Sequence, residues 1–234
     1  MTMYSSVLTF FIFILFFSFP PEENYPQIFG DDYSDALAFV EKNQVFALTT
    51  FSGDTLQAKK AWAIVFPELI RYSMVRDFFE TSALEILYVK NGKEAADFSI
   101  GPFQMKPSFV EELEFISKQH YPALAKKICI DGSDKEQNRK VRLERLKTLK
   151  GQLQYLKAYI SIYIDKESLQ KLPPNTQVIY LAHAYNHGIK AKVQGHEANS
   201  LLNSNKYFPY GSKYPGKQYS YAAIANYFFK NQPN

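Results

Sequence analysis

Hydrophobic positions along most of the chain recur every three or four residues, which is the spacing of an amphipathic helix. The clearest stripe predicts one long helix over residues 136–164 and is formed by Leu146, Leu149, Leu153, Leu156, Ile160 and Tyr163. Weaker stripes of the same spacing predict helices over residues 34–42, 54–66, 75–89, 109–119, 175–187 and 219–230. Strictly alternating segments are few and short, so we expect a mainly α fold.

The first 21 residues carry no charged side chain and contain an almost unbroken apolar run. This run, residues 7–19, has 13 positions (19 − 7 + 1), which suits a signal peptide and is short for a membrane span. No Lys or Arg precedes it and no Ala-x-Ala site follows it, so an uncleaved anchor that tethers the protein to a membrane is the alternative. We therefore expect an exported protein of the periplasm or cell envelope. Its predicted parts are a signal peptide or anchor (1–21), an acidic, proline-containing linker (22–33) and one domain (34–234).

Composition and charge narrow the functional class. Of the 234 residues, 46% are hydrophobic, enough for a packed core, and the net charge of +4 is too small to indicate a nucleic-acid partner. The single cysteine, Cys129, excludes a disulfide framework and a cysteine-based zinc site. His183 and His187 have the spacing of helical zinc ligands, but Ala184 stands where a zinc protease has glutamate. We expect neither a metal nor a cofactor, and nothing in the sequence indicates an oligomeric state.

An apolar stretch over residues 97–109 cannot form one regular element, because Gly101, Pro102 and Pro107 interrupt it. Polar side chains recur within it at Asp97, Ser99 and Gln104. Leaving such groups buried without partners costs a few kcal/mol, so we expect them to contact a ligand. The alternative is a buried loop that only joins two helices.

Two glutamates are candidates for a general acid. Glu68 follows the apolar run 63–66 and Pro67, and apolar surroundings raise the pKa of a carboxyl group toward the range a general acid requires. The alternative is a structural ion pair between Glu68 and Arg71 or Arg76. Glu80 is the second candidate, and its alternative is a solvated position on a helix.

Three segments, taken in order, resemble lytic transglycosylases of the soluble-transglycosylase type. Residues 61–68 (Ala-Trp-Ala-Ile-Val-Phe-Pro-Glu) resemble the helix that ends in the catalytic glutamate of that family. Residues 100–105 (Ile-Gly-Pro-Phe-Gln-Met) resemble its Gly-Leu-Met-Gln turn, and residues 184–188 (Ala-Tyr-Asn-His-Gly) resemble its Ala-Tyr-Asn-Ala-Gly motif. The resemblance covers residues 53–188, and an export signal suits a cell-wall enzyme.

The chain also departs from the family pattern. Leu69 follows Glu68 where the family usually has serine, and Pro102 and Phe103 replace leucine and methionine in the turn. Glu68 precedes the turn glycine by 33 positions (101 − 68), which is longer than is usual in the family, whereas Glu80 precedes it by 21 (101 − 80). We assign the acid to Glu68, with residues 75–89 as an inserted helix, and keep Glu80 as the runner-up.

The resemblance implies a lysozyme-like helical domain that binds peptidoglycan glycan strands. It implies cleavage of the β-1,4 bond between N-acetylmuramic acid and N-acetylglucosamine by one glutamate, with a 1,6-anhydro product. It implies that Gln104 and the backbone at Gly101 line the sugar groove, and that Tyr185 and Asn186 hold the acid and a sugar group. Asp97 and Ser99 are further candidates for substrate binding, because of their place in the apolar turn. Tyr185 has a purely structural alternative, as a core residue with a locally satisfied hydroxyl.

Three other functions stay open at this stage. A goose-type lysozyme-like hydrolase would use Glu80 or Asp97 as a second carboxylate. A non-catalytic envelope protein would keep the fold and bind glycan strands. A membrane-tethered assembly factor would use the N-terminal segment and the basic face of the predicted helix 136–164.

Overall fold

The computed structural model describes residues 23–75, 82–193, 195–204, 206–211, 213 and 215–232. The predicted leader and Glu80 lie outside these residues. The described part is mainly helical with little sheet, as the sequence predicts. Its helices are α1 (Tyr25–Phe29), α2 (Asp31–Thr50), α3 (Thr55–Val75), α4 (Ser82–Asn91), α5 (Pro107–His120), α6 (Pro122–Ile128), α7 (Lys135–Leu146), α8 (Leu149–Lys166), α9 (Pro174–His187), α10 (Ala198–Asn203) and α11 (Tyr221–Asn231), with a 3₁₀ turn at Leu169–Lys171. Two short antiparallel strands, β1 (Lys206–Phe208) and β2 (Tyr219–Ser220), form the sheet.

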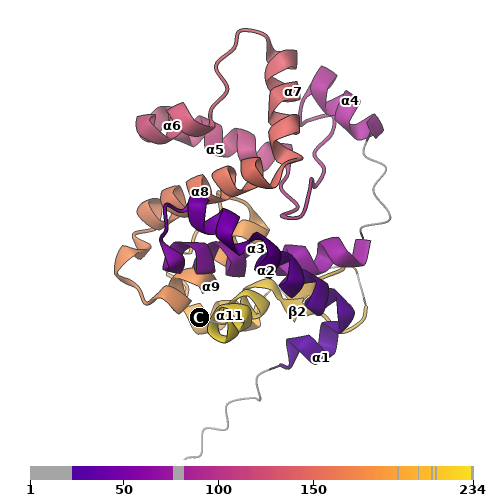
Figure 1. The fold of residues 1–234 in the computed structure, drawn as a ribbon, viewed down its shortest axis with the longest axis vertical. Coiled ribbons are helices and arrows are strands. Elements are labelled where there is room, and N and C mark those ends of the chain that lie inside the picture. The colour runs from indigo at the N-terminus through magenta and orange to yellow at the C-terminus, as the bar shows by residue number, and fades with distance from the viewer. Residues whose placement is uncertain are drawn as a thin grey trace, which may run out of the picture.

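The helices form two groups (Figure 1). Helices α4, α5, α6 and α7 lie together at the top of the view, and α2, α3, α8, α9 and α11 form the larger group below. Helix α3 packs against α2, α8, α9 and α11, while α8 contacts helices of both groups. None of the helices described combines the length and the apolar composition that a membrane crossing needs.

Helix α3 is the centre of the larger group. It begins after Asp54, whose side chain accepts the Gln57 N–H at 2.9 Å. All residues from Ala61 to Phe66 are buried, and the Phe66 ring stacks on Phe228 of α11 with 3.7 Å between centroids. The sequence predicts that Pro67 kinks or ends this helix, and the second outcome is wrong, because α3 continues through Pro67 to Val75. Burial against neighbouring helices on both sides of the proline outweighs the loss of one backbone hydrogen bond.

The predicted long helix over 136–164 is also wrong, since it is two helices, α7 and α8, separated at Lys147 and Thr148. The Thr148 hydroxyl accepts the Gly151 N–H at 3.1 Å and begins α8. A Cβ at Gly151 would overlap the Arg145 carbonyl oxygen, so this close approach of α8 to the end of α7 requires glycine. The apolar stripe continues across the break because both helices face the same core.

The segment predicted as a linker, residues 22–33, contains α1 and the start of α2 where the structure describes it. The Asn24 side chain accepts the Gln27 N–H at 3.3 Å and Pro26 lies in the first turn, which fixes the start of α1. Tyr25 is buried and makes edge-on ring contacts with Tyr219 and Tyr227. Aromatic packing against the C-terminal part of the chain therefore orders a stretch whose composition predicts a linker.

A buried polar network joins the upper helices to α8. Arg142 of α7 donates two hydrogen bonds to Glu114 of α5, at 2.7 and 3.0 Å, and one to the Tyr88 hydroxyl of α4 at 2.9 Å. Tyr155 of α8 donates to the same Glu114 carboxylate at 2.8 Å. Arg142 and Glu114 are 8% and 5% exposed, so each needs the other to offset its desolvation. This network fixes α5, which forms one wall of the cleft described next.

Candidate functional site

A cleft of about 560 Å³ opens between the C-terminal half of α3, the 97–109 segment, the start of α5 and the C-terminal end of α9. It is lined by Glu68, Arg71, Lys93, Asp97, Ser99, Gln104, Met105, Lys106, Ser108, Phe109, Glu112, Tyr185, Asn186, His187, Gly188, Ile189 and Lys190. Six of the residues predicted from the sequence are among them, namely Glu68, Asp97, Ser99, Gln104, Tyr185 and Asn186. Segments more than 100 residues apart in sequence therefore meet at one cavity.

Glu68 lies on α3, one residue after Pro67, and is 5% exposed. Its neighbours on the helix, Phe66 and Leu69, are buried in the core. Burial raises the pKa of the Glu68 carboxyl above its ordinary value, because the charged form loses solvation. The Arg71 guanidinium, the Tyr221 hydroxyl and Lys106 lower the same pKa, in that order, and offset only part of the rise.

The alternative role of Glu68, a structural ion pair with Arg71, is also present in the structure. Arg71 Nη1 lies 3.0 and 3.4 Å from the two carboxylate oxygens of Glu68. The Arg71 guanidinium also lies 5.1 Å from the centroid of the Phe208 ring on β1, which holds it over the cleft. Glu68 is thus both ion-paired and buried at the floor of a cavity, and burial has the larger effect on its pKa.

The raised pKa predicts how Glu68→Gln changes stability with pH. The folded protein holds this proton more tightly than the unfolded chain, so Glu68 contributes stability below its ordinary pKa of 4.5, and this contribution is lost as the pH rises through the raised value. Glutamine cannot ionise. We expect the Tm of Glu68→Gln to exceed that of the wild type in alkaline solution, with the difference shrinking as the pH falls below the raised pKa. A thermal unfolding series across pH measures this, and a variant less stable at every pH would contradict it.

The 97–109 segment folds into a compact turn. Ile100 and Met105 pair as an isolated bridge, and Gly101 and Gln104 both have positive φ, at 64° and 49°. The Gln104 amide donates to the Gly101 carbonyl at 2.8 Å, so the two residues of the motif hold each other. Gly101 does not itself line the cleft. It shapes the backbone that presents Gln104.

Gln152 of α8 supports this turn from behind. Its buried amide donates to the Ile100 and Leu146 carbonyls at 2.8 and 2.7 Å and accepts the Phe103 N–H at 2.9 Å. A Cβ at Gly101 would overlap this amide, so the glycine is required here by close approach as well as by φ. The turn is therefore fixed by a residue that the sequence alone did not indicate.

We expect Gln152→Ala to destabilise the protein by about 2–4 kcal/mol, because it opens a cavity and leaves two buried backbone groups, the Phe103 N–H and the Leu146 carbonyl, without their partner, while the Ile100 carbonyl keeps its bond from the Met105 N–H. Equilibrium denaturation measures the loss. Gln154→Ala is the matched control, since Gln154 lies on the exposed side of the same helix. Its expected cost is within about 0.5 kcal/mol. Equal costs for the two variants would contradict the role given to Gln152.

Asp97 and Ser99 occupy the cleft wall in different ways. The Asp97 carboxylate accepts the Ser108 N–H at 2.9 Å and the Ser108 hydroxyl at 2.7 Å, which caps the start of α5. Asp97 is therefore engaged in the fold as well as exposed to the cavity. Ser99 lines the cavity beside it.

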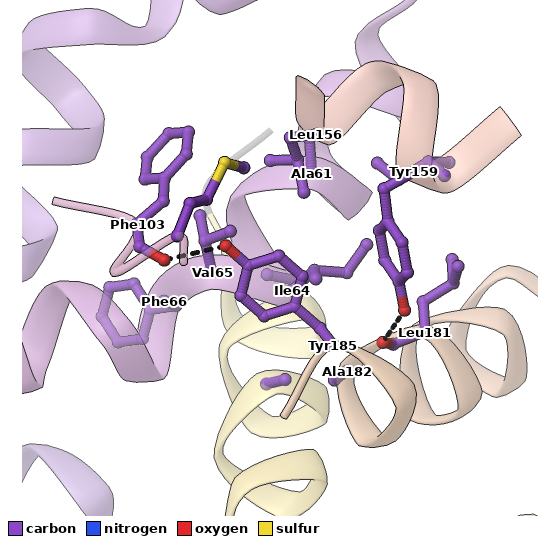
Figure 2. Packing of buried hydrophobic residues seen from close by; sticks show 14 of the residues in the cluster. Ala61, Ile64, Val65, Phe66, Phe103, Leu156, Tyr159, Leu181, Ala182 and Tyr185 are labelled. Atoms are coloured by element: carbon purple, nitrogen blue, oxygen red, sulfur yellow. Dashed lines mark hydrogen bonds between the residues drawn. The ribbon is translucent and has the colours of Figure 1, made fainter. Parts of the chain in front are cut away.

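Tyr185 and Asn186 reach the cleft from the end of α9. The Tyr185 hydroxyl donates to the Phe103 carbonyl at 2.8 Å, as Figure 2 shows, and ties α9 to the turn that carries Gln104. Burial, with a smaller contribution from the charge of Glu68, raises the pKa of Tyr185 well above its ordinary value. Tyr185 is thus a core residue whose hydroxyl has a protein partner, which agrees with the purely structural role considered for it. Asn186 is exposed in the cleft.

The basic lining of the cleft was not predicted from the sequence. Lys93 pairs with Glu111 at 3.6 Å, and Lys190 pairs with Glu112 at 3.3 Å. Lys106 precedes Pro107 directly after the Gln104 turn, so its position could have been inferred from that turn. Lys93 and Lys190 are brought there by tertiary structure alone and give no sequence signal.

The described residues include no group of three or more His, Cys, Asp or Glu side chains placed to hold a metal. The His183 and His187 rings stack with 4.3 Å between centroids, and His187 Nδ1 lies 2.8 Å from the His183 carbonyl oxygen. Burial, with the neighbouring His187 and His196, lowers the pKa of His183 to about 4. The His183 side chain is therefore neutral near pH 7.

Comparison with known proteins gives no assignment. No family model matches the chain, and neither the curated proteins nor the solved structures include one significantly similar to it.

Proposed function

We propose that this protein is an exported lytic transglycosylase that cleaves the β-1,4 bond between N-acetylmuramic acid and N-acetylglucosamine in peptidoglycan. The observation that carries the proposal is a buried carboxyl group with a raised pKa, Glu68, at the floor of a cleft. The same cleft is lined by Gln104 and Asn186, which belong to the two other motifs of the resemblance. The single residue assigned to acid–base catalysis is Glu68.

In the first step the protonated Glu68 carboxyl donates its proton to the glycosidic oxygen, and the bond to the anomeric carbon of the muramoyl sugar breaks. The resulting carboxylate then accepts the proton of the C6 hydroxyl, whose oxygen attacks the same anomeric carbon and forms the 1,6-anhydro ring. Burial favours the neutral acid before the first step, and Arg71 at 3.0 Å stabilises the carboxylate between the steps. An internal nucleophile reacts efficiently because it is held near the reacting carbon.

The other carboxylates of the cleft favour this mechanism over hydrolysis by two carboxylates. Asp97 caps α5 through Ser108, and Glu112 pairs with Lys190. Each is held by another protein group and is a poor candidate for a base that activates water or for a nucleophile. The proposed product is therefore an anhydro sugar end. Glu80 lies outside the described residues, so the runner-up assignment is decided by experiment.

The second candidate is a non-catalytic protein that binds glycan strands in the same cleft, and the Glu68–Arg71 ion pair favours it. Incubating the full-length chain with dye-labelled peptidoglycan sacculi separates the two functions. The enzyme releases soluble dye continuously, whereas a binding protein co-sediments with the sacculi and releases none. Co-sedimentation without release overturns the proposed function.

A further inference from the structure

The cations that line the cleft differ in how they are paired with carboxylates. Lysines 93 and 190 have carboxylate partners in Glu111 and Glu112. Among the described residues, the one carboxylate paired with Arg71 is Glu68, and Lys106 forms no ion pair. Lys106 is exposed and close enough to Glu68 to lower the pKa of its carboxyl. Two cations of the cleft, Arg71 and Lys106, thus lie near the buried Glu68, while Asp97, also in the cleft, is hydrogen-bonded to Ser108 and forms no ion pair with a described residue.

Arg71 has an unused hydrogen-bonding edge. Glu68 occupies Nη1, while the Nε–H is buried and has no acceptor. A buried donor left unpaired costs about 1–3 kcal/mol, so an acceptor supplied by a ligand would recover that energy. The Nε and Nη2 edge of a guanidinium fits the two oxygens of a carboxylate side by side. The side chain as a whole is 28% exposed and lines the cavity, so a ligand group can reach the guanidinium, and a small rotation of the guanidinium then brings the buried Nε–H to the ligand.

We propose that Arg71 and Lys106 form an anion-binding subsite that holds a carboxylate of the ligand beside Glu68. The choice of ligand rests on the proposed function: in peptidoglycan the carboxylates belong to the stem peptide attached to the muramoyl sugar. The subsite then selects glycan that carries peptides over neutral glycan. Lys106 supplies charge from the entrance of α5, and Arg71 supplies charge and a planar pair of donors from α3.

Binding at this subsite is coupled to protonation of Glu68. The titratable or charged groups facing Glu68 are Arg71 on its own helix, Lys106 before α5, Tyr185 on α9 and Tyr221 on α11. A bound carboxylate competes with the Glu68 carboxylate for the two cations, and two negative charges side by side are unfavourable. Glu68 therefore takes up a proton as the ligand binds. By reciprocity, ligand affinity falls as Glu68 ionises, and the bound substrate itself promotes the acid form.

Isothermal titration calorimetry tests this with the full-length chain and two probes. The acidic probe is the disaccharide GlcNAc-MurNAc bearing a tetrapeptide, which lacks the bond to be cleaved, and the neutral probe is chitobiose. In buffers of different ionisation enthalpy, we expect uptake of up to one proton with the acidic probe only, and affinity for this probe that falls as the pH rises through the raised pKa of Glu68. Glu68→Gln is expected to show no uptake. A pH-independent affinity for the acidic probe overturns the proposal.

Two lysine variants test whether binding of the acidic probe depends on a charge within the cleft. Lys106→Ala is expected to weaken binding of the acidic probe about five- to tenfold and leave chitobiose binding unchanged. Lys127→Ala removes the same charge from an exposed position on α6 outside the cleft and is expected to change neither. Equal effects of the two variants overturn the subsite. Because the readout is binding, it is independent of turnover: failure to release fragments from sacculi would refute the enzyme and leave the anion subsite standing.

Discussion

Replacing Glu68 by glutamine is expected to lower the rate of dye release from labelled sacculi by about a thousandfold or more, because general acid–base catalysis contributes roughly a hundred- to ten-thousandfold. Glutamine keeps the size of the side chain and removes the transferable proton. The fold remains, since the surrounding apolar residues of α3 stay packed and a neutral group suits their environment. Loss of activity with an unchanged or raised Tm would therefore separate chemistry from folding.

Two matched substitutions make this result specific. Glu112→Gln changes another carboxylate of the same cleft, which pairs with the exposed Lys190, and is expected to lower the rate less than about fivefold. Glu80→Gln tests the runner-up acid and is expected to retain activity. If Glu80→Gln is inactive and Glu68→Gln is active, the acid is Glu80 and the ion pair of Glu68 with Arg71 is structural.

The largest loss of stability is expected for Arg142→Ala, at about 3–5 kcal/mol, because it leaves the buried Glu114 carboxylate without its cation. Tyr155 would remain as a partner of Glu114, and one neutral hydrogen bond does not offset the lost charge pair. The change loosens α5 against α7 and α8. Because α5 forms a wall of the cleft, we also expect weaker glycan binding at temperatures below global unfolding.

Equilibrium denaturation measures the free energy of unfolding, and Arg145→Ala on the same helix is the control. Arg145 donates one hydrogen bond to the Ile128 carbonyl at 2.7 Å, so its loss is expected to cost about 1 kcal/mol. If Arg142→Ala costs no more than Arg145→Ala, the network contributes little and does not hold the cleft wall.

The sequence predicted those parts of the site that depend on interactions between residues close together in the chain. The apolar run 61–66 before Glu68 produced a buried helix, and the breakers Gly101, Pro102 and Pro107 produced a turn that presents Gln104. These predictions were within reach because periodicity and special backbone residues act within a few positions. They did not require knowledge of what packs against them.

The features that the sequence left hidden depend on partners far along the chain. Gln152 fixes the turn 49–52 positions away, and Tyr221 of α11 approaches Glu68 from the far end of the sequence. The break between α7 and α8 was not predicted, because the apolar stripe continues across it. Its local signals are Thr148, which caps α8, and Gly151, which allows the close approach to α7. Polar side chains carry no periodic signal that names their partner, so these contacts appear only in three dimensions.

The most direct test of the account is mass spectrometry of the fragments released from purified sacculi by the full-length chain. If Glu68 is the single acid and base, the muropeptides end in 1,6-anhydro-N-acetylmuramic acid, each lighter by one water than the hydrolysed form, and Glu68→Gln yields none. Reducing ends in place of anhydro ends would contradict the transglycosylase mechanism and indicate a hydrolase. Undiminished anhydro products from Glu68→Gln would contradict the role assigned to Glu68.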